Sequence, residues 1–242
     1  MTKDKPTIRI CHLYPEDMNI YGDLGNIITL RKRLEWRGYG VVVDEVNVGQ
    51  DYDFKGADIL MAGGGQDRGQ LLVADDLQAK SEALHAAYQD DLPMLLICGS
   101  YQLFGNYFQT IEDTRIPGIG IFDAVTTATD RRLIGNVVID SVFGKIVGFE
   151  NHSGATVLAD GVEALGKVEK GHGNDGASGH EGAISRNCIG TYLHGPVLVK
   201  NPVLADSIIS RALKRSYDIV ELERLDDELE LATASQAASR PQ

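Results

Sequence analysis

The stretch that decides the fold is Leu92-Pro93-Met94-Leu95-Leu96-Ile97-Cys98-Gly99-Ser100-Tyr101-Gln102-Leu103-Phe104-Gly105. Its apolar run is typical of a buried parallel strand, and the residues after Cys98 predict a short helix. A sharp turn at Gly99 would expose the thiol and direct the first N–H groups of the helix toward whatever the thiol attacks. The helix N-terminus would favour the thiolate. Taken alone, these residues fit a buried core cysteine equally well.

The overall composition is that of a globular chain with an acidic balance. The 242 residues are 43% hydrophobic and 24% charged, which suits one large α/β domain or two small ones. The formal net charge of −12 argues against nucleic acid or an anionic membrane as a main partner, because both are themselves negative. An anionic small substrate held by one or two arginines is still compatible with this charge.

Cysteine usage and the start of the chain indicate the compartment. Cys11, Cys98 and Cys188 form no CxxC pair, which is neither a disulfide framework nor a zinc-finger pattern, so a reducing cytoplasm is expected. Residues 1–6 lack a signal-peptide pattern, and no apolar run reaches membrane-spanning length. Cys11 and Cys188 lie within or beside predicted strands and are expected in the core.

The first half of the chain alternates strands and helices. Strands are predicted at 7–13, 39–48 and 57–61 and before Cys98, and helices at about 27–37 and 70–88. This alternation predicts an α/β fold with a mostly parallel central sheet and helices on both faces. In such sheets, ligands bind beyond the carboxyl ends of the strands.

The second half predicts an added antiparallel portion, which we expect to wrap on the same sheet. Its strands are predicted at 119–126, 133–139, 145–150, 183–186 and 189–193, followed by a helix at 201–215. Residues 7–215 are therefore expected to form a single domain. The acidic and then Ala/Ser/Gln-rich tail, 221–242, is expected to be disordered.

Three groups fall at predicted strand ends and can face one crevice. Gly63-Gly64-Gly65 follows one strand, Cys98 another and His194 a third. The glycines fit a tight turn, and they also fit a backbone N–H donor for an oxyanion; they match no phosphate-loop pattern. A Cys–His pair far apart in sequence is the expected form of a thiol nucleophile site, so His194 is the natural base for Cys98.

The glycine-rich stretch 171–182 contains histidines and acids that could suggest a metal site. No predicted helix or strand fixes the spacing of these side chains, so a flexible surface loop is the better interpretation. No metal is expected.

Several motifs together resemble the class I (triad-type) glutamine amidotransferases of the cobyric-acid-synthase-like branch. They are Cys98-Gly99-Ser100-Tyr101-Gln102-x-x-Gly105, Gly63-Gly64-Gly65-Gln66-Asp67 and Tyr192-Leu193-His194-Gly195-Pro196. Two further stretches are similar to the glutaminase subunits of lipid II isoglutaminyl synthases: His12-Leu13-Tyr14-Pro15 with Asn19-x-Tyr21-Gly22-Asp23-x-Gly25-Asn26, and Gly148-Phe149-Glu150-Asn151-His152. The resemblance covers roughly residues 7–215.

The resemblance implies a glutaminase that needs no cofactor. Cys98 would attack the side-chain amide of L-glutamine, and backbone N–H groups of Gly65 and Gly99 would hold the oxyanion. His194 would protonate the departing ammonia, leaving a glutamyl thioester that water hydrolyses.

Two side chains are implied as substrate contacts. Gln102 would help to hold glutamine, and Arg132 would bind its α-carboxylate, for which a guanidinium fork is well suited. Arg131 could serve instead, or Arg132 could be an ordinary surface arginine.

The sequence departs from the family pattern at two positions. Leu96 stands where the family has Gly two residues before the nucleophile, and Pro196 stands where the triad glutamate is usual. The chain would then work as a Cys–His dyad, or an acid from elsewhere, such as the partner subunit, would orient His194.

The resemblance also implies a partner. A Mur-ligase-like, ATP-dependent synthetase subunit would form a heterodimer with this chain and use its ammonia to amidate D-glutamate of the lipid II stem peptide in peptidoglycan synthesis. This chain has no Walker A loop with which to bind ATP itself. The alternatives are an amidotransferase for cobyric acid or a related cofactor, a cysteine peptidase-like or chaperone-like protein on the same scaffold, and a non-catalytic interaction module.

Overall fold

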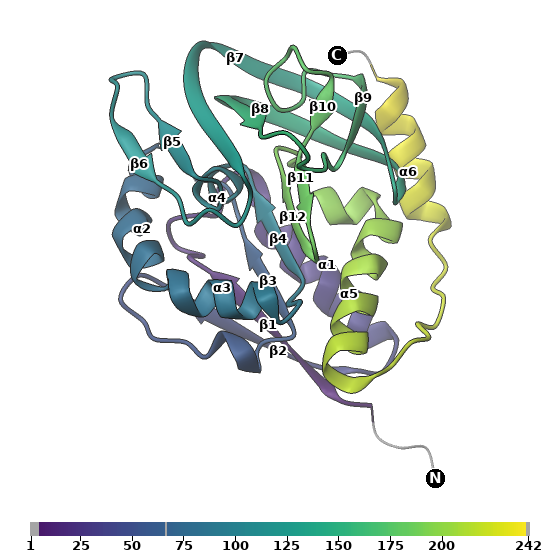
Figure 1. Cartoon of the computed structure of the whole chain (residues 1–242). Helices are drawn as coiled ribbons and strands as arrows, with labels where there is room; N and C mark the ends of the chain where they lie inside the picture. Colours follow the sequence, from purple (N-terminus) through teal and green to yellow (C-terminus); the bar gives the residue numbers. More distant parts are fainter. Residues whose placement is uncertain (1–4, 66, 241–242) are drawn as a thin grey trace.

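The computed structural model describes residues 5–65 and 67–240, without the side chains of residues 67 and 68. Gln66 of the glycine motif, the first four residues and the last two residues of the tail lie outside this part. Within it the chain forms two sheets, one above the other in Figure 1, with helices around the lower one.

The lower sheet is the predicted parallel sheet, and its strand order places β4 near the centre. The order is β11 (Ala183–Ser185), β12 (Cys188–Thr191), β4 (Met94–Ile97), β3 (Ile59–Ala62), β1 (Thr7–Leu13) and β2 (Gly40–Val46). All neighbours are parallel except the edge pair β11 and β12. Every residue of β4 is fully buried, which explains its unbroken apolar run.

Helices cover both faces of this sheet, as predicted. Figure 1 shows α1 (Leu24–Trp36) and α5 (Pro202–Tyr217) on one side of it, and α2 (Asp67–Ala79) and α3 (Ser81–Gln89) on the other. The helix predicted at 70–88 is divided in two at Lys80, whose side chain pairs with Asp76 one turn earlier. Cys11 and Cys188 are fully buried, as expected for core cysteines.

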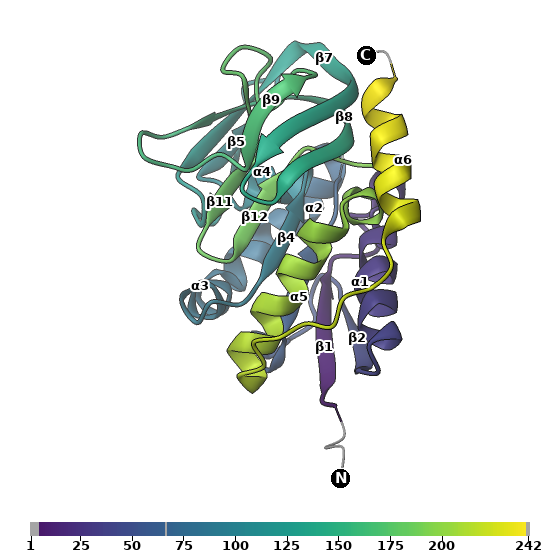
Figure 2. The same ribbon diagram turned by 90° about the vertical axis from the view of Figure 1, so that its right-hand side faces the viewer.

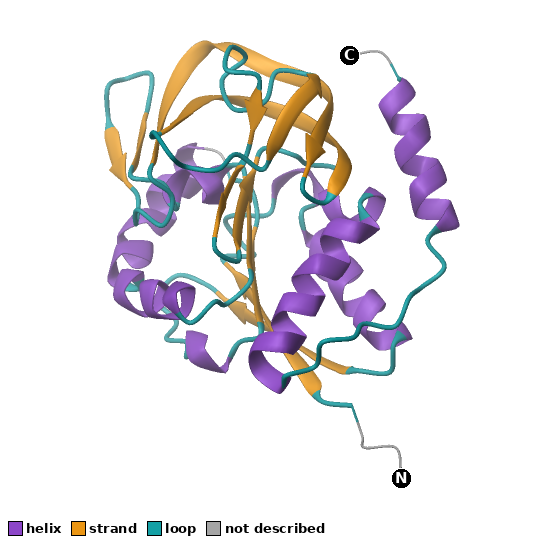
Figure 3. Ribbon diagram, turned by 45° about the vertical axis from the view of Figure 1, so that its right-hand side comes forward, coloured by secondary structure: helices purple, strands orange, loops and turns teal. Residues whose placement is uncertain are grey.

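The predicted antiparallel portion is divided: β11 and β12 join the parallel sheet, and the remaining strands form a sheet of their own instead of wrapping on it. Its path is β10 (His180–Glu181), β9 (Gly166–Lys170), β7 (Ala124–Ser141), β5 (Tyr107–Gln109) and β6 (Arg115–Pro117), with β8 (Gly144–Leu158) paired to β7. The strands β7 and β8 form a long hairpin that curves over the parallel sheet (Figure 3). The second sheet meets the end of the parallel sheet through an antiparallel bridge between Phe149 of β8 and His194, which follows β12.

Part of the C-terminal tail is helical, whereas the sequence predicted disorder. Residues 228–239 form helix α6 (Glu228–Ser239). Figure 2 shows α6 beside β8. The segment leading to it is held by Arg33, a 2% exposed guanidinium of α1 that pairs with Asp206 at 2.7 Å and Asp227 at 2.6 Å. A buried arginine requires carboxylate partners, so the tail acids are used in packing and are not all solvated. No helix in the described part of the chain is long and apolar enough to cross a membrane.

Candidate active site

Cys98 lies at a strained turn directly after β4 and before the short helix α4 (Gly99–Leu103). Its φ of 51° and ψ of −106° are rarely adopted by non-glycine residues. The Cys98 N–H donates to the carbonyl of Thr191 at 2.8 Å, which ties the turn to the end of β12. Strain of this kind is characteristic of a nucleophile elbow, where the turn presents the side chain at the sheet edge.

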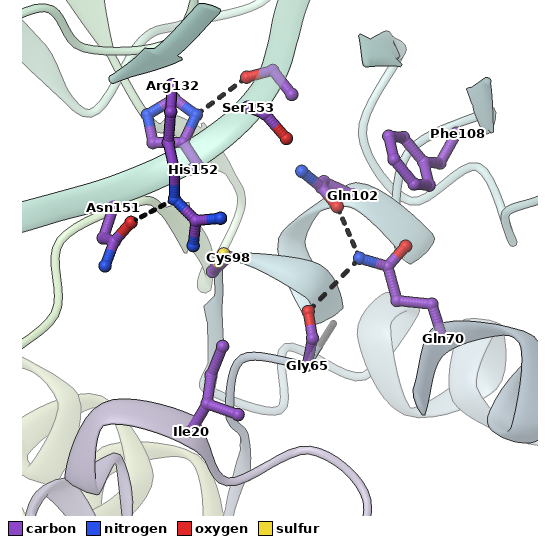
Figure 4. A pocket seen from close by; sticks show the side chains of 11 residues that line it. Ile20, Gly65, Gln70, Cys98, Gln102, Phe108, Arg132, Asn151, His152 and Ser153 are labelled. Atoms are coloured by element: carbon purple, nitrogen blue, oxygen red, sulfur yellow. Dashed lines mark hydrogen bonds between the residues drawn. The ribbon is translucent and has the colours of Figure 1, made fainter. Parts of the chain in front are cut away.

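The thiol lines a pocket of about 420 Å³ between the two sheets (Figure 4). Cys98, Gly65, Gln70 and Gln102 come from the parallel-sheet side, and Ile20 from the loop before α1. The opposite wall is formed by β7 and β8 of the antiparallel sheet, through Arg132, Asn151, His152, Ser153 and Gly154. The separate second sheet is therefore the lid of the pocket, and Cys98 is on its floor.

His194 lies at the end of β12, close to Cys98, and is fully buried. Its Nδ1–H donates to Asp23 Oδ1 at 3.2 Å. Burial opposes the charged imidazolium, but the Asp23 carboxylate and the Cys98 thiolate outweigh burial and raise the pKa of His194 to about 10. At neutral pH the imidazole is therefore protonated, with its Nδ1–H held by Asp23, while its buried Nε2 has no hydrogen-bond partner within the described residues.

Asp23 was missed as a site residue by sequence reasoning. In the sequence it is one residue of the 19–26 motif, which carries the resemblance but predicts no role for this acid. Its carboxylate is fully buried, and its Oδ2 accepts the Gly64 N–H at 2.7 Å. The same motif places the Tyr21 ring against His194, with 4.9 Å between ring centroids. A buried carboxylate between a histidine and a backbone N–H could have been sought among the acids of this motif.

The glycine loop packs directly against the turn and the imidazole. A Cβ added to Gly99 would lie 2.9 Å from the backbone nitrogen of Gly65, and one added to Gly64 would lie 2.9 Å from His194 Cε1. Real Cβ contacts are not this short, so the glycines permit an approach that other residues would prevent. The structure thus brings Gly65, Gly99, Cys98 and His194 together.

Arg132 is the arginine that reaches the pocket; Arg131 is not among the lining residues. Arg132 Nε donates to Asn151 Oδ1 at 2.6 Å, and one terminal nitrogen donates to the Tyr21 hydroxyl at 3.0 Å. Figure 4 shows the guanidinium extending toward Cys98 from the opposite wall. The two hydrogen bonds fix the plane of the guanidinium while leaving donors for a ligand.

Gln102 lines the pocket with its amide already held at both ends. Its carbonyl accepts from Gln70 Nε2 at 2.7 Å, and its Nε2 donates to the Tyr192 hydroxyl at 3.0 Å. The Tyr192 hydroxyl also hydrogen-bonds Thr156 at 2.6 Å, and its ring stacks on His152 at 3.6 Å. This network connects the α4 side of the pocket to β8.

The glycine-rich stretch 171–182 is held more firmly than a flexible loop. The fully buried carboxylate of Glu150 accepts from the backbone N–H of His172 at 2.8 Å and that of Gly173 at 2.9 Å. Asn174 then bonds both the carbonyl and the N–H of Gly182. In the described residues, no three His, Cys, Asp or Glu side chains are grouped as a metal site.

Comparison with known proteins agrees with this geometry. The family of CobB/CobQ-like glutamine amidotransferase domains matches residues 9–202. The GatD subunit of lipid II isoglutaminyl synthase (glutamine-hydrolyzing) from Staphylococcus aureus is 40% identical over 93% of this chain and 92% of its own length. The Streptococcus pneumoniae subunit of the same name is 41% identical over 87% of this chain and 82% of its own.

More distant relatives share part of the chain or the fold alone. A probable cobyric acid synthase from Methanosphaera stadtmanae is 34% identical over 43% of this chain and 24% of its own length. A crystal structure described as a glutamine amidotransferase has a TM-score of 0.57 over 84% of this chain and 98% of its own, at 13% identity. A glutamine amidotransferase from Thermotoga maritima gives 0.51 over 95% and 90%, also at 13% identity.

Proposed function

This chain belongs to the family of CobB/CobQ-like glutamine amidotransferase domains, and we propose that it is the glutaminase subunit of a lipid II isoglutaminyl synthase. It hydrolyses L-glutamine to glutamate and ammonia through Cys98 and His194. The observation that carries this proposal is a single pocket with Cys98 on its floor and the fixed guanidinium of Arg132 on its opposite wall. A thiol and a carboxylate-binding group separated by a pocket suit an amino acid with a reactive side-chain amide.

The first half of the reaction is acyl transfer to sulfur. The Cys98 thiolate attacks the side-chain amide carbon of glutamine, and the carbonyl oxygen becomes an oxyanion. The N–H groups of Gly65 and Gly99 stabilise that oxyanion. His194 gives its Nε2 proton to the amide nitrogen, and the C–N bond breaks. Ammonia departs, and a glutamyl thioester remains on Cys98.

The second half restores the enzyme. Once the sulfur is acylated it carries no negative charge, so His194 loses one of the groups that favour its charged form. The now neutral imidazole accepts a proton from water, whose oxygen attacks the thioester. Glutamate leaves, and the thiolate–imidazolium pair forms again.

Substrate recognition is divided between the two sheets. Arg132 binds the α-carboxylate of glutamine through a charge-assisted pair. Gln102 holds the substrate as a fixed part of the pocket wall, because Gln70 and Tyr192 already orient its amide. Arg131, outside the lining, takes no part.

The ammonia passes to a Mur-ligase-like, ATP-dependent subunit in the cytoplasm, which amidates D-glutamate of the lipid II stem peptide. The two GatD relatives, matched over most of both chains, support this acceptor. Free ammonia is mostly protonated at neutral pH, so a docked heterodimer protects it from loss. An acceptor in cobyric acid synthesis has weaker support, because the cobyric acid synthases are matched over small parts of their own length, 24% in one and 35% in another.

The test is ammonia and glutamate release from L-glutamine by the purified chain, with and without a co-expressed Mur-ligase-like subunit. Cys98→Ala is the inactive control. Release that requires Cys98 and increases with the partner supports the proposal. No release under either condition, with a thiol untouched by alkylating glutamine analogues, would support a peptidase-like or non-catalytic protein instead.

A further inference from the structure

The environment of His194 contains an acid that the family pattern does not predict. The usual position for that acid is occupied by Pro196, yet the imidazole is not without a carboxylate, because Asp23 Oδ1 is 3.2 Å from Nδ1. The other Asp23 oxygen accepts the Gly64 N–H at 2.7 Å. One buried carboxylate thus contacts both the base and the loop expected to hold the oxyanion.

The segment that carries Asp23 is fastened to the segment that carries His194. A Cβ added to Gly25 would lie 2.1 Å from Pro196 Cγ, so the proline ring is seated on the bare backbone of that glycine. Next along the chain, Asn26 Oδ1 accepts the N–H of Leu198 at 2.9 Å. Gly25 and Asn26 come just after Asp23, and their partners come just after His194. The contacts therefore run in the same order along both segments and hold the start of α1 beside residues 194–198.

This arrangement gives Pro196 a structural explanation. A side chain at position 196 faces Gly25, and the ring fills the space beside the start of α1. The Asp23 carboxylate reaches the His194 imidazole from the segment between β1 and α1. The acid beside His194 therefore comes from a different segment of the chain than the one in which the family pattern places it.

We propose that Asp23 is the positioning residue of His194, completing a Cys98–His194–Asp23 arrangement within this single chain. It holds the proton on Nδ1, so that only Nε2 exchanges a proton with the reacting atoms. It also fixes the Gly63–Gly65 loop through the Gly64 N–H. The inference rests on the proposed glutaminase function and replaces an acid borrowed from a partner subunit.

The test compares three variants of the full chain with the wild type. Asp23→Asn keeps the shape but presents an amide N–H or a neutral oxygen to the imidazole, which removes the charge and permits the wrong tautomer. Gly25→Ala forces the two segments apart without changing any charge. Glu16→Gln is the matched control, an exposed acid of the same loop that contacts Asn47. Each variant is measured for kcat and KM for glutamine and for the pH dependence of Cys98 alkylation by iodoacetamide.

For Asp23→Asn we expect kcat to fall about 100-fold with KM within about threefold, the range of a general acid–base contribution. The alkylation rate near pH 6 should fall about tenfold while the rate near pH 10 matches the wild type, because the imidazolium no longer supports the thiolate. Gly25→Ala should change both in the same direction by a smaller factor. Glu16→Gln should match the wild type.

An Asp23→Asn alkylation profile that coincides with the wild-type profile would overturn the inference. Recovery of full Asp23→Asn turnover on adding the synthetase subunit would also overturn it, since the partner would then supply the acid. The alkylation profile needs no glutamine, so it still decides the role of Asp23 if the wild-type chain releases no ammonia and the proposed function fails.

Discussion

The floor and the lid of the Cys98 pocket are built in opposite ways. The reacting part of the floor consists of residues that follow the ends of buried parallel strands, where the topology of the sheet brings Cys98 and Gly65 to one edge. The lid consists of side chains in the middle of two long antiparallel strands, where position depends on register and side-chain bonds. Topology therefore brings the reacting groups to one edge, where the bond to Asp23 orients His194, whereas the recognition groups of the lid depend on hydrogen bonds throughout.

The difference predicts how each side fails on mutation. Loss of a reacting group on the floor should stop the chemistry while leaving glutamine binding intact. Loss of a lid residue should weaken binding while leaving the intrinsic reactivity of the thiol intact.

The largest effect is expected for the floor. Cys98→Ala should lower glutamine hydrolysis at least about 1,000-fold, because no other nucleophile lies in the pocket lining at that position. Binding of glutamine, measured by calorimetry, should change by less than about threefold. A matching loss of binding would show that the floor also recognises substrate and would remove the division between the two sides.

The lid is tested by Arg132→Ala. A charge-assisted pair with the substrate carboxylate is worth about 1.5–3 kcal/mol, so KM for glutamine should rise roughly 10- to 100-fold. Alkylation of Cys98 by iodoacetamide, which has no carboxylate, should not change. Arg131→Ala is the control and should keep the wild-type KM, since Arg131 does not line the pocket. The opposite result for the two arginines would assign the carboxylate to Arg131.

The junction between floor and lid is tested by Tyr192→Phe. Losing the hydroxyl removes the partner of Gln102 Nε2 and one of the hydrogen bonds of Thr156, which keeps its bond to Thr126, and this should cost about 1–3 kcal/mol of unfolding free energy. With Gln102 less fixed, kcat/KM should fall roughly tenfold. Tyr14→Phe is the control: it removes a buried hydroxyl bonded to Asp76, away from the pocket, so it should lose stability but no activity. Equal losses of activity would mean that the network acts only through stability.

The sequence predicted the floor better than the lid for a physical reason. The apolar run before Cys98 and the alternation of strands and helices determine which residues reach the carboxyl edge of a parallel sheet. Arg132 was expected only through the resemblance, since nothing local indicates that a strand of 18 residues will curve over the pocket. Asp23 was missed because its role depends on contacts with Gly64 and His194, which are distant in sequence.

The same limit applies to the glycine-rich stretch and the tail. Both are polar, and polarity predicts solvated chain when the partners are unknown. Glu150 holds the glycine-rich stretch, and Arg33 holds the tail through Asp227. A buried charge makes a distant polar segment part of the structure, and a single sequence does not show which charges will be buried.

The smallest effect on activity is expected for Glu181, which joins the two sheets. It lies in β10, is fully buried, and accepts hydrogen bonds from Thr191 and from the Tyr192 N–H at 2.9 Å. Burial raises the pKa of Glu181 from near 4.5 to about 7, although those two hydrogen bonds oppose the shift.

The sign of the pH effect follows from this raised pKa. Between about pH 4.5 and pH 7 the unfolded chain has lost the Glu181 proton while the folded chain keeps it. The free energy of unfolding should therefore fall as pH rises through this window, by about 3 kcal/mol from this group, and stay level above it. Glu181→Gln should flatten that slope in urea titrations at successive pH values, whereas Glu163→Gln, at an exposed position, should leave it unchanged. An unchanged slope in Glu181→Gln would mean that the carboxylate is ionised in the folded protein, and that the floor and lid are joined by a buried charge.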